Sequence, residues 1–593
     1  MRMIRFAVLL VAGMGVAQTA QIPAALAQTQ SAPSAAIDNV TVDAGFAIYR
    51  IRRIEVFGGT MSTTDLRQLF DTNDPKPLPD RLRTITADRI SIPEVVAELT
   101  TGRPGQSVTY RNLVLSSVSA GRVAGAAAQG TSMALVDENG GNVSADFGAF
   151  AAHNVDLVLA GRIASSSRSG EEPKALLYES FSMDGGGLVA PKDNFEITFG
   201  PISGSNVKAR PFSTPLSALP KRDGPVNVMT PEQKRITAGF AADLLDSFEI
   251  GNFEMRDIGF KGLNDAKPVN GRIDRMVLAG IGDAKVEEFS FAGFSTTTPE
   301  GIRVSLGNLA FRGFDMSATR NRLRIAASDL AQPLEDAKPR ELMPNLREFS
   351  LAGFEYSGKA SDGAVASGAD GNNVRIGKIE MHGSELYEGM PTALTATMDG
   401  LSFDVSPTAS DNNIRAIAGL GYSSVNIGSR MDMAWKQTAQ ELAVNEVSVA
   451  AGGMGTLKLK GTLTNVSKDL FAPEPAIVQA AALSALVKNV DLTVSDQGLL
   501  NRVIANEAKR SGRTPDAVRS EWVSAAAVGI PAALGDAPAG RTLGSAVSRF
   551  IAKPGTLHIS ANAPNGIGAA EFMLFSQDPT GFLKRIDVQA SAE

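Results

Sequence analysis

The sequence predicts a mainly β protein with helices, an α+β fold whose elongated, repetitive antiparallel sheet ends in a mixed helical C-terminal cap. A pattern of the form apolar–polar–apolar–polar–Gly, usually followed by Phe, returns through the middle of the chain. Beyond residue 468 the spacing of the apolar residues changes to the spacing typical of helices. A recurring strand pattern of this kind indicates a long sheet rather than a compact enzyme with a pocket.

The first residues have the layout of an export signal. Two arginines lie within Met1–Arg5, an apolar run covers Phe6–Val16, and Ala25–Ala27 is a small-x-small cleavage site. The apolar run is too short to span a bilayer. We therefore expect residues 1–27 to be a cleaved signal peptide and the mature protein to be periplasmic, with secretion as the alternative. Residues 28–47 are expected to be a disordered start of the mature chain.

Composition limits the compartment and the partners. The 593 residues include no Cys, which excludes disulfides and a lipidated cysteine. No later segment holds eighteen uninterrupted apolar residues, so we expect no transmembrane span in the mature chain. The net charge is −6 with both signs interspersed, so there is no basic footprint for nucleic acid.

Residues 48–229 are expected to form an N-terminal β-rich mixed module. Its end, residues 200–229, is rich in Pro, Gly and Ser and predicts a connection. Within the module, alternation and capping residues predict strands at Tyr49–Gly58, Val108–Leu115 and Leu176–Met183, and short helices at Thr63–Phe70 and Ser91–Leu99.

Residues 230–467 are expected to form the repetitive sheet body. A capping box, Thr230 to Gln233 with Pro231 between them, predicts a helix at its start. The clearest copies of the repeat are Phe289–Phe294, Leu309–Phe314 and Phe349–Phe354. The glycines that mark the copies, with two looser ones, are Gly262, Gly293, Gly313, Gly353 and Gly383.

The gaps between these glycines are near-multiples of ten, which suggests one strand plus one turn, with each Gly at a turn or bulge. The insert at residues 317–345 predicts a short helix, and Gly358–Asn373 a polar hairpin tip. Thr456–Leu463 is the last strongly alternating strand of the body.

Residues 468–593 are expected to be a mixed α/β cap that covers the open edge of the sheet. The patterns predict helices at Pro475–Val487, Leu499–Arg510, from Thr514 past Trp522, and at Leu543–Ile551, with strands at Val490–Val494, Thr556–Ala561 and Phe582–Val588.

Residues able to carry catalysis are scarce. The three histidines are His153, His382 and His558, and no Gly-x-Ser-x-Gly segment supplies a nucleophile. Asp137–Asn142 resembles half of a calcium loop but lacks the later carboxylate, so it predicts a hairpin turn. We expect no catalytic, metal or cofactor-binding residues, and we keep a hydrolase that uses His153 as the least favoured hypothesis.

An apolar stripe is the strongest functional pattern. One interpretation is a packed core between one sheet face and the helices; the other is an open apolar groove that holds acyl chains. The candidate ligand-facing residues of the second interpretation are Phe260, Phe289, Phe291, Phe311, Phe349, Phe354 and Phe403.

Val286–Phe294, Leu306–Phe314 and Met398–Phe403, taken with the export signal and the helical tail, resemble the AsmA-like and YdgA-like families of bacterial periplasmic proteins. In AsmA-like proteins, such strands form a long curled sheet with an apolar channel, associated with phospholipid movement and outer-membrane homeostasis. Those proteins usually keep an N-terminal membrane anchor, whereas Ala27–Gln28 resembles a cleavage site. The resemblance supplies no catalytic residues.

Three functions therefore stand as expectations. The first is a non-enzymatic envelope protein that binds or moves lipid along an apolar sheet face. The second is a structural or interaction protein of the cell envelope that has a fully packed core, binds no ligand and meets other envelope proteins. The third is the hydrolase.

Overall fold

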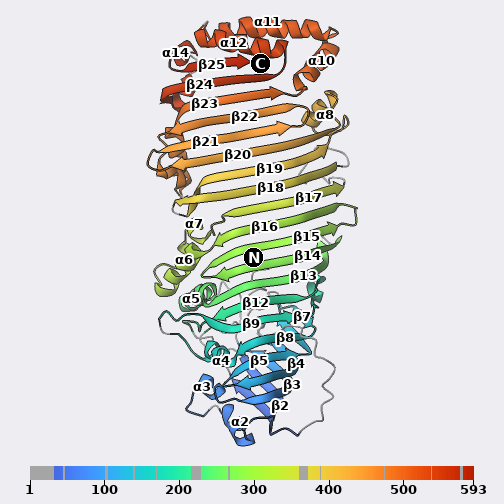
Figure 1. Ribbon diagram of the computed structural model, residues 1–593, viewed down its shortest axis with the longest axis vertical. Coiled ribbons are helices and arrows are strands. Elements are labelled where there is room, and N and C mark those ends of the chain that lie inside the picture. The colour runs from blue at the N-terminus through green and yellow to red at the C-terminus, as the bar shows by residue number, and fades with distance from the viewer. Residues whose placement is uncertain are drawn as a thin grey trace. The chain divides into compact units, whose positions relative to one another are not determined.

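The computed structural model describes residues 32–593 apart from 44–46, 72, 101–103, 138–139, 169, 215–218, 220–228, 265–266, 359–371, 388, 473, 536 and 575–578. Strands account for 51% and helices for 26%, which confirms a mainly β protein with helices. The chain forms two compact units (Figure 1). Unit 1 holds residues 1–299 and 311–346, and unit 2 holds 300–310 and 347–593. The predicted boundaries at residues 229 and 467 stay predictions.

Unit 1 is built from long antiparallel strands with helices beside them. Its strands are β1 (Ala35–Asp43), β2 (Ala47–Phe57), β3 (Ala87–Leu99), β4 (Ser107–Ser119), β5 (Arg122–Ala128), β6 (Gly130–Val136), β7 (Asn142–Phe147), β8 (Phe150–Asp156), β9 (Ala175–Met183), β10 (Gly186–Ala190), β11 (Phe195–Phe199), β12 (Ile202–Ala209), β13 (Phe248–Asn264), β14 (Lys267–Gly282), β15 (Lys285–Thr297) and the end of β16 (Arg303–Asp315). Its helices are α2 (Thr63–Leu69), α3 (Leu78–Leu82), α4 (Leu157–Ser165), α5 (Pro231–Ser247), α6 (Ser317–Ser328) and α7 (Pro339–Leu342).

The sheet of unit 1 divides into two branches between β4 and β13. Val114–Ser119 of β4 pairs with β5, whereas Ser107–Arg111 pairs with β6. One branch then runs β5–β8–β9–β12 and the other β6–β7–β10–β11. Both rejoin β13, where β12 pairs with Phe248–Met255 and β11 with Gly259–Lys261.

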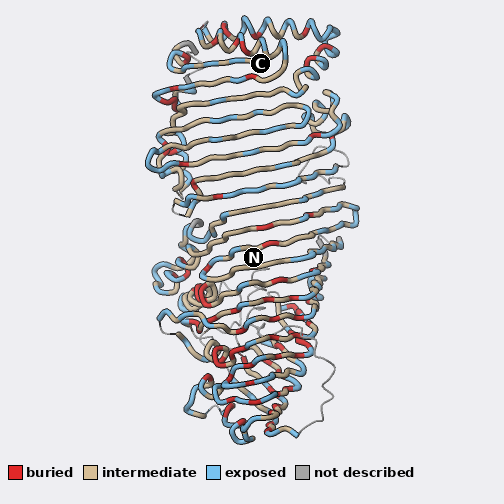
Figure 2. The backbone as a smooth tube through the Cα atoms, viewed as in Figure 1, coloured by how far each residue is buried: buried red, intermediate tan, exposed pale blue. Residues whose placement is uncertain are grey.

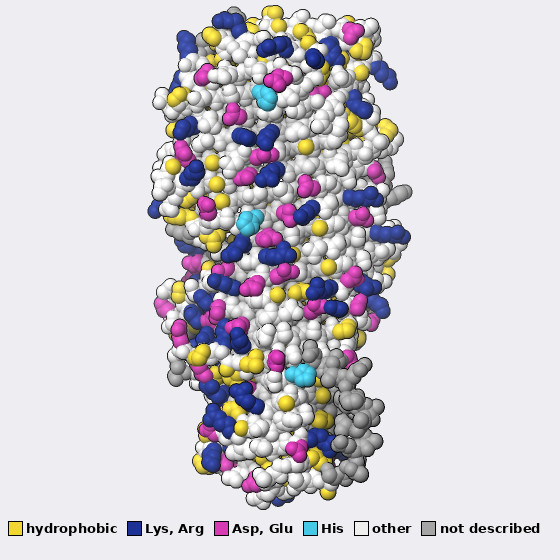
Figure 3. All heavy atoms as spheres, viewed as in Figure 1, with side chains coloured by type: hydrophobic (Ala, Val, Ile, Leu, Met, Phe, Trp, Pro, Cys, Tyr) yellow, Lys and Arg dark blue, Asp and Glu magenta, His cyan; other side chains and the backbone are white. Residues whose placement is uncertain are grey.

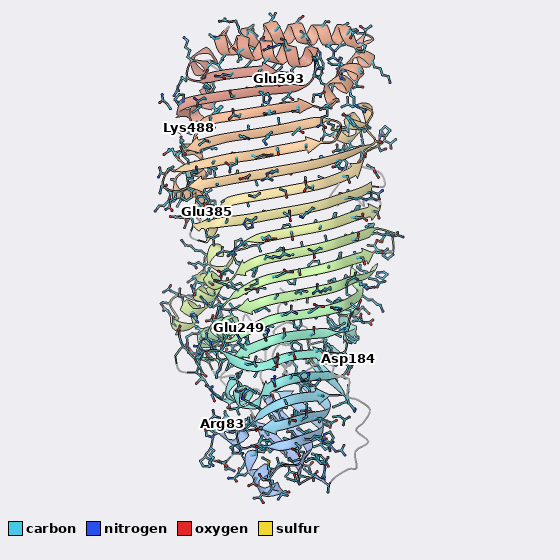
Figure 4. The ribbon with its side chains drawn as sticks, viewed as in Figure 1. Arg83, Asp184, Glu249, Glu385, Lys488 and Glu593 are labelled. Carbon is cyan, nitrogen blue, oxygen red and sulfur yellow. The ribbon has the colours of Figure 1, made fainter. Side chains whose placement is uncertain are left out.

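The branches arise because four successive long strands each break in the middle. The breaks fall at Gln129, Gly148–Ala149, Asp184–Gly185 and Gly200–Pro201 (Figure 4 labels Asp184). Backbone hydrogen bonds continue across them; the Gly148 N–H, for example, donates to the Gly185 carbonyl at 2.9 Å. The bent strands enclose the main cluster of buried apolar residues, which is drawn from β1–β10, β12 and α2 (Figure 2).

A polar network joins α5 and α6 in unit 1. The predicted capping box is confirmed, because the Gln233 N–H donates to Thr230 Oγ1 at 3.2 Å. Asp246 of α5 is buried and receives Arg320 Nη1 of α6 at 3.0 Å, with Arg324 as a second partner. Breaking such a buried pair costs about 3–5 kcal/mol, so the network holds the two helices together.

Unit 2 is a run of antiparallel strands in which each pairs with the next in sequence. The strands are β17 (Glu348–Gly358), β18 (Asn372–Tyr387), β19 (Met390–Asp404), β20 (Ser424–Lys436), β21 (Glu441–Ala451), β22 (Gly455–Thr464), β23 (Leu486–Asp496), β24 (Thr556–Ile567) and β25 (Asp587–Ala592). The helices are α8 (Asn412–Gly419), α9 (Pro475–Ser484), α10 (Leu499–Ser511), α11 (Pro515–Ala533), α12 (Pro538–Ala552), α13 (Ala569–Leu574) and α14 (Pro579–Leu583).

The repeat glycines lie inside strands rather than at turns. Gly293, Gly313 and Gly353 have φ of 69°, 65° and 66°, the left-handed region that favours glycine. Pairing continues in register on both sides of Gly353, from Ala352 with Lys378 to Phe354 with Ile376. The expectation of a turn is therefore wrong, and β13–β19 are 11 to 17 residues long.

Several other local predictions are wrong. Ser91–Leu99 belongs to strand β3 and not to a helix. It is hydrogen-bonded to β2 on one side and to β4 on the other. Residues 28–47 include β1, which pairs with β2 instead of being disordered. The supposed connection at 200–229 begins with β12, and Phe582–Val588 is divided between α14 and β25.

Other predictions are confirmed or lie outside the described residues. The strands at Tyr49–Gly58 and Thr456–Leu463, the hairpin between β6 and β7, and the helix within 317–345 are present. The signal peptide at 1–27 and the hairpin tip beyond Gly358 lie outside the described part of the chain.

The breaks in unit 1 predict a strong response to a single methyl group. A Cβ added at Gly185 would lie 2.1 Å from the Phe199 carbonyl oxygen. We expect Gly185→Ala to lower the free energy of unfolding by about 1–3 kcal/mol, because backbone must shift to make room. Denaturant unfolding of the purified protein measures this. Gly239→Ala is the control, because its Cβ would meet its nearest neighbours at 3.4 Å within helix α5, and it should be neutral or stabilising by up to about 1 kcal/mol. Equal stability of Gly185→Ala and the parent would contradict the account.

Candidate ligand-binding face

Strand pairing in unit 2 lines up two apolar rows that cross nine strands, and these rows together are the apolar face. The first row is Leu351, Ile379, Met398, Ser429, Val449, Leu457, Val494, Leu557 and Ala592. The second row is Phe349, Met381, Ala396, Met431, Val447, Leu459, Leu492, Ile559 and Ala590. Directly paired residues share a face, so the rows form one surface whose single polar member is Ser429.

The residues between the two apolar rows form a polar row on the opposite face. Its members are Ser350, Glu380, Thr397, Arg430, Ser448, Lys458, Thr493, His558 and Ser591. Side chains of a strand alternate between the two faces, so the sheet separates apolar from polar residues along its whole run. Figure 3 looks onto the polar face, where basic and acidic side chains are interspersed.

The apolar face is only partly covered. Leu457, Val449 and Met381 have exposed fractions of 48%, 44% and 41%. Most other members are of intermediate exposure, as the tan strands β17–β23 show in Figure 2. Among the described residues, the clusters of buried apolar side chains lie elsewhere, in the N-terminal strands and between helices. No second layer of unit 2 therefore buries this face in the way that the core of unit 1 is buried.

Two borders of the apolar face are closed. At one lateral edge, the rings of Tyr387, Trp435 and Phe471 pack together, with 4.8 Å between the centroids of Trp435 and Phe471. Trp435 is buried and donates from Nε1 to the Val466 carbonyl at 2.8 Å. At the C-terminal end of the sheet, helix α12 packs against β25 and β24, and Leu557 is only 7% exposed there.

The last strand is tied down as well. Glu593 exchanges two backbone hydrogen bonds with Thr556, at 2.9 and 3.0 Å, which fixes the end of the chain beside the start of β24 (Figure 4). Figure 1 shows α11 and α12 lying beyond β25 at this end of unit 2. The helices there cover a sheet edge whose free N–H and C=O groups would otherwise invite pairing with another chain.

The seven predicted ligand-facing phenylalanines divide between the units. In unit 1, Phe289 contacts Phe291 and stacks on Phe311, with ring centroids 6.2 and 6.1 Å apart. Phe260 stacks on Phe294 at 6.3 Å. These rings pack on one another across β13–β16.

In unit 2, Phe349 belongs to the second apolar row. Phe354 pairs with Ile376, and Phe403 pairs with Val374 and Val425 nearer the other lateral edge. The choice of phenylalanines missed the exposed aliphatic residues Leu457 and Val449. The alternation of Thr456–Leu463 was the available signal for Leu457.

The histidines do not assemble a catalytic group. His153 of β8 pairs with Ser180, while Asp156 accepts the Leu159 N–H at 2.9 Å and pairs with Arg122 at 3.0 Å. His382 and His558 lie on the polar strand positions. In the part of the chain that the structure describes, no three His, Asp or Glu side chains group as metal ligands, and no helix has the length and hydropathy needed to cross a membrane.

Carboxylates on the polar strand positions are held by basic and hydroxyl partners. In unit 1, Arg275 Nη2 donates to Glu254 at 2.7 Å and Arg256 adds a second bond, which together lower the pKa of Glu254. In unit 2, Lys458 donates to Glu446 at 2.6 Å and Ser448 adds a second bond, so the pKa of Glu446 is lowered too. The polar face is thus a paired, charge-balanced surface rather than a charged patch.

Comparison with known proteins gives one match. A family model described as "Uncharacterized protein" matches residues 448–593, a segment that runs from the end of β21 through β25 and includes α9–α14. No curated protein matches the chain. The matched segment contains the closed end of the apolar face.

The lowered carboxylate pKa values predict acid sensitivity. A carboxylate whose pKa is lower in the folded chain contributes stability above its unfolded pKa of about 4.3, and loses it as pH falls through the folded pKa. We expect the melting temperature to hold from pH 7 to about 5 and then to fall. The difference between parent and Glu254→Gln should shrink as the pH is lowered toward 3. A difference in melting temperature that is constant with pH would show that the charge of Glu254 contributes nothing.

Proposed function

We propose that this chain is a non-enzymatic protein of the cell envelope whose apolar face in unit 2 binds the acyl chain of a lipid. The supporting observation is an apolar surface that crosses nine strands and is partly exposed, with exposed fractions of 48% at Leu457 and 44% at Val449. Exposed apolar surface of this extent marks an interaction site in soluble proteins.

Magnitudes favour a long acyl chain over a small apolar molecule. A fully buried methylene group contributes about 0.8 kcal/mol, so a methylene that lies on an open face contributes about half of that. About sixteen methylenes then gain about 6 kcal/mol, which exceeds the lower end of the cost of association, about 4 kcal/mol. A ligand with only a few carbons would not stay on such a surface.

The proposal includes the export that the sequence predicts. A cleaved signal peptide would place the apolar face in the periplasm, between two membranes that supply lipid. The proposal also includes an elongated sheet that ends in a mixed helical cap. The alternative, a structural protein with a fully packed core and no ligand, requires burial of the apolar rows; the exposure of Met381, Val449 and Leu457 favours lipid binding over it.

A charge placed on the apolar face should abolish lipid binding. Val449→Glu puts a carboxylate against the bound chain, and an unpaired polar group buried there costs about 1–3 kcal/mol. We expect the affinity for a fluorescent long-chain fatty acid to fall by about tenfold or more, as measured by equilibrium titration of delipidated mature protein.

Ala450→Glu is the matched control. Ala450 is the next residue on β21, is exposed on the opposite face and pairs with Gly428 and Thr456. The control should bind the fatty acid like the parent. Equal affinities of the two variants would count against the apolar face as the site.

A further inference from the structure

Three methionines surround one alanine in unit 2, and we call them the methionine cluster. Ala396 of β19 pairs directly with Met381 of β18 on one side and with Met431 of β20 on the other. Met398 lies two residues from Ala396 on the same strand, so its side chain leaves the same face of the sheet. The chain has only 18 methionines among 593 residues, so composition alone does not account for three of them around one position.

The strand register allows the three thioether sulfur atoms to meet above Ala396. Directly paired residues on neighbouring strands have Cβ atoms about 4.5–5.5 Å apart, and two residues along one strand span about 7 Å. A methionine side chain is unbranched and has three rotatable bonds, so each sulfur can reach inward across these distances. Alanine ends at its Cβ atom, which leaves the space above it to the surrounding side chains.

The methionine cluster can be reached from solvent and lies apart from charged ligands. Met381 has an exposed fraction of 41%, and the other two members are of intermediate exposure. Glu380, next to Met381, belongs to the polar row on the opposite face, and so does Arg430, next to Met431. Within the two apolar rows, Ser429 supplies the nearest hydroxyl group. The cluster therefore offers thioether sulfur atoms with no carboxylate or imidazole beside them in these rows.

We propose that Met381, Met398 and Met431 bind a soft monovalent cation of the Cu(I) type. Neutral thioethers are soft ligands that select Cu(I), whereas Mg²⁺, Ca²⁺ and Mn²⁺ prefer oxygen ligands. The chain has no cysteine, so no thiolate of its own competes for such an ion. The site goes beyond the proposed lipid binding and does not depend on it.

Competition with the chromogenic Cu(I) chelator bicinchoninate tests the site on the purified protein under anaerobic, reducing conditions. The parent should withdraw one Cu(I) per chain more than the triple variant Met381→Leu, Met398→Leu, Met431→Leu. The affinity of the variant should be at least about 10–100-fold lower, because loss of even an outer partner of a metal ligand has that effect. Leucine nearly conserves the volume of methionine, so the variant should keep its fold.

Met343→Leu is the matched control. Met343 is 63% exposed and belongs to unit 1, outside the methionine cluster. This variant should take up as much Cu(I) as the parent. Equal Cu(I) binding by the parent and the triple variant would overturn the proposal.

The pH dependence of binding separates thioethers from other ligands. A thioether has no proton to lose, whereas a histidine or a carboxylate must be deprotonated before it binds a metal. The affinity of the parent, corrected for protonation of the chelator, should therefore be the same at pH 5 and pH 7. An affinity that falls as the pH passes the ordinary histidine pKa of about 6.5 would assign the ion to histidine and overturn the proposal.

Discussion

The structure of unit 2 depends on one constraint, the antiparallel hydrogen-bond ladder that holds nine strands in an unbroken sequence. The ladder fixes which residues are neighbours, and the pleat sends alternate side chains to opposite faces. Leu457 pairs with Val449 and Val494, whereas the next residue, Lys458, pairs with Ser448 and Thr493. Each strand therefore adds apolar residues to one face of the sheet and polar residues to the other. A shift of the register by one residue would move the apolar side chains to the polar face and the polar ones to the apolar face. The strand register therefore determines whether the apolar face exists.

Glycine modifies this regular sheet in two ways. In unit 1, Gly185 and its counterparts at the other breaks let strands bend, and the bent strands enclose a core of their own. In the repeat, Gly353 takes a left-handed conformation within a strand, and the pairing of β17 with β18 continues on both sides of it. The first device accompanies the main cluster of buried apolar residues, whereas the strands of unit 2 carry an extended apolar face. On the polar side of the sheet, Glu446 is paired with Lys458.

Sequence patterns could predict the class of the fold and most helices of the C-terminal part, because capping residues and apolar spacing are local signals. They failed where contacts distant in the sequence determine the secondary structure. Ser91–Leu99 begins with residues typical of a helix start, yet it forms a strand because it pairs with β2 and β4. The breaks in unit 1 share no single local signal, because one falls at Gln129 and another combines Gly200 with Pro201. For the site, the phenylalanines drew attention to the repeat, but the rings of unit 1 pack on one another. The open part of the face is lined by Leu457, Val449 and Met381, whose exposure depends on what does not cover them.

The most direct test of the central claim is native mass spectrometry, with lipid extraction, of the purified protein. An uncovered apolar face predicts bound lipid at a defined stoichiometry, which delipidation removes and added long-chain lipid restores. A mass equal to that of the protein alone, unchanged when lipid is added, would contradict the account and would mean that the face is covered in solution by protein.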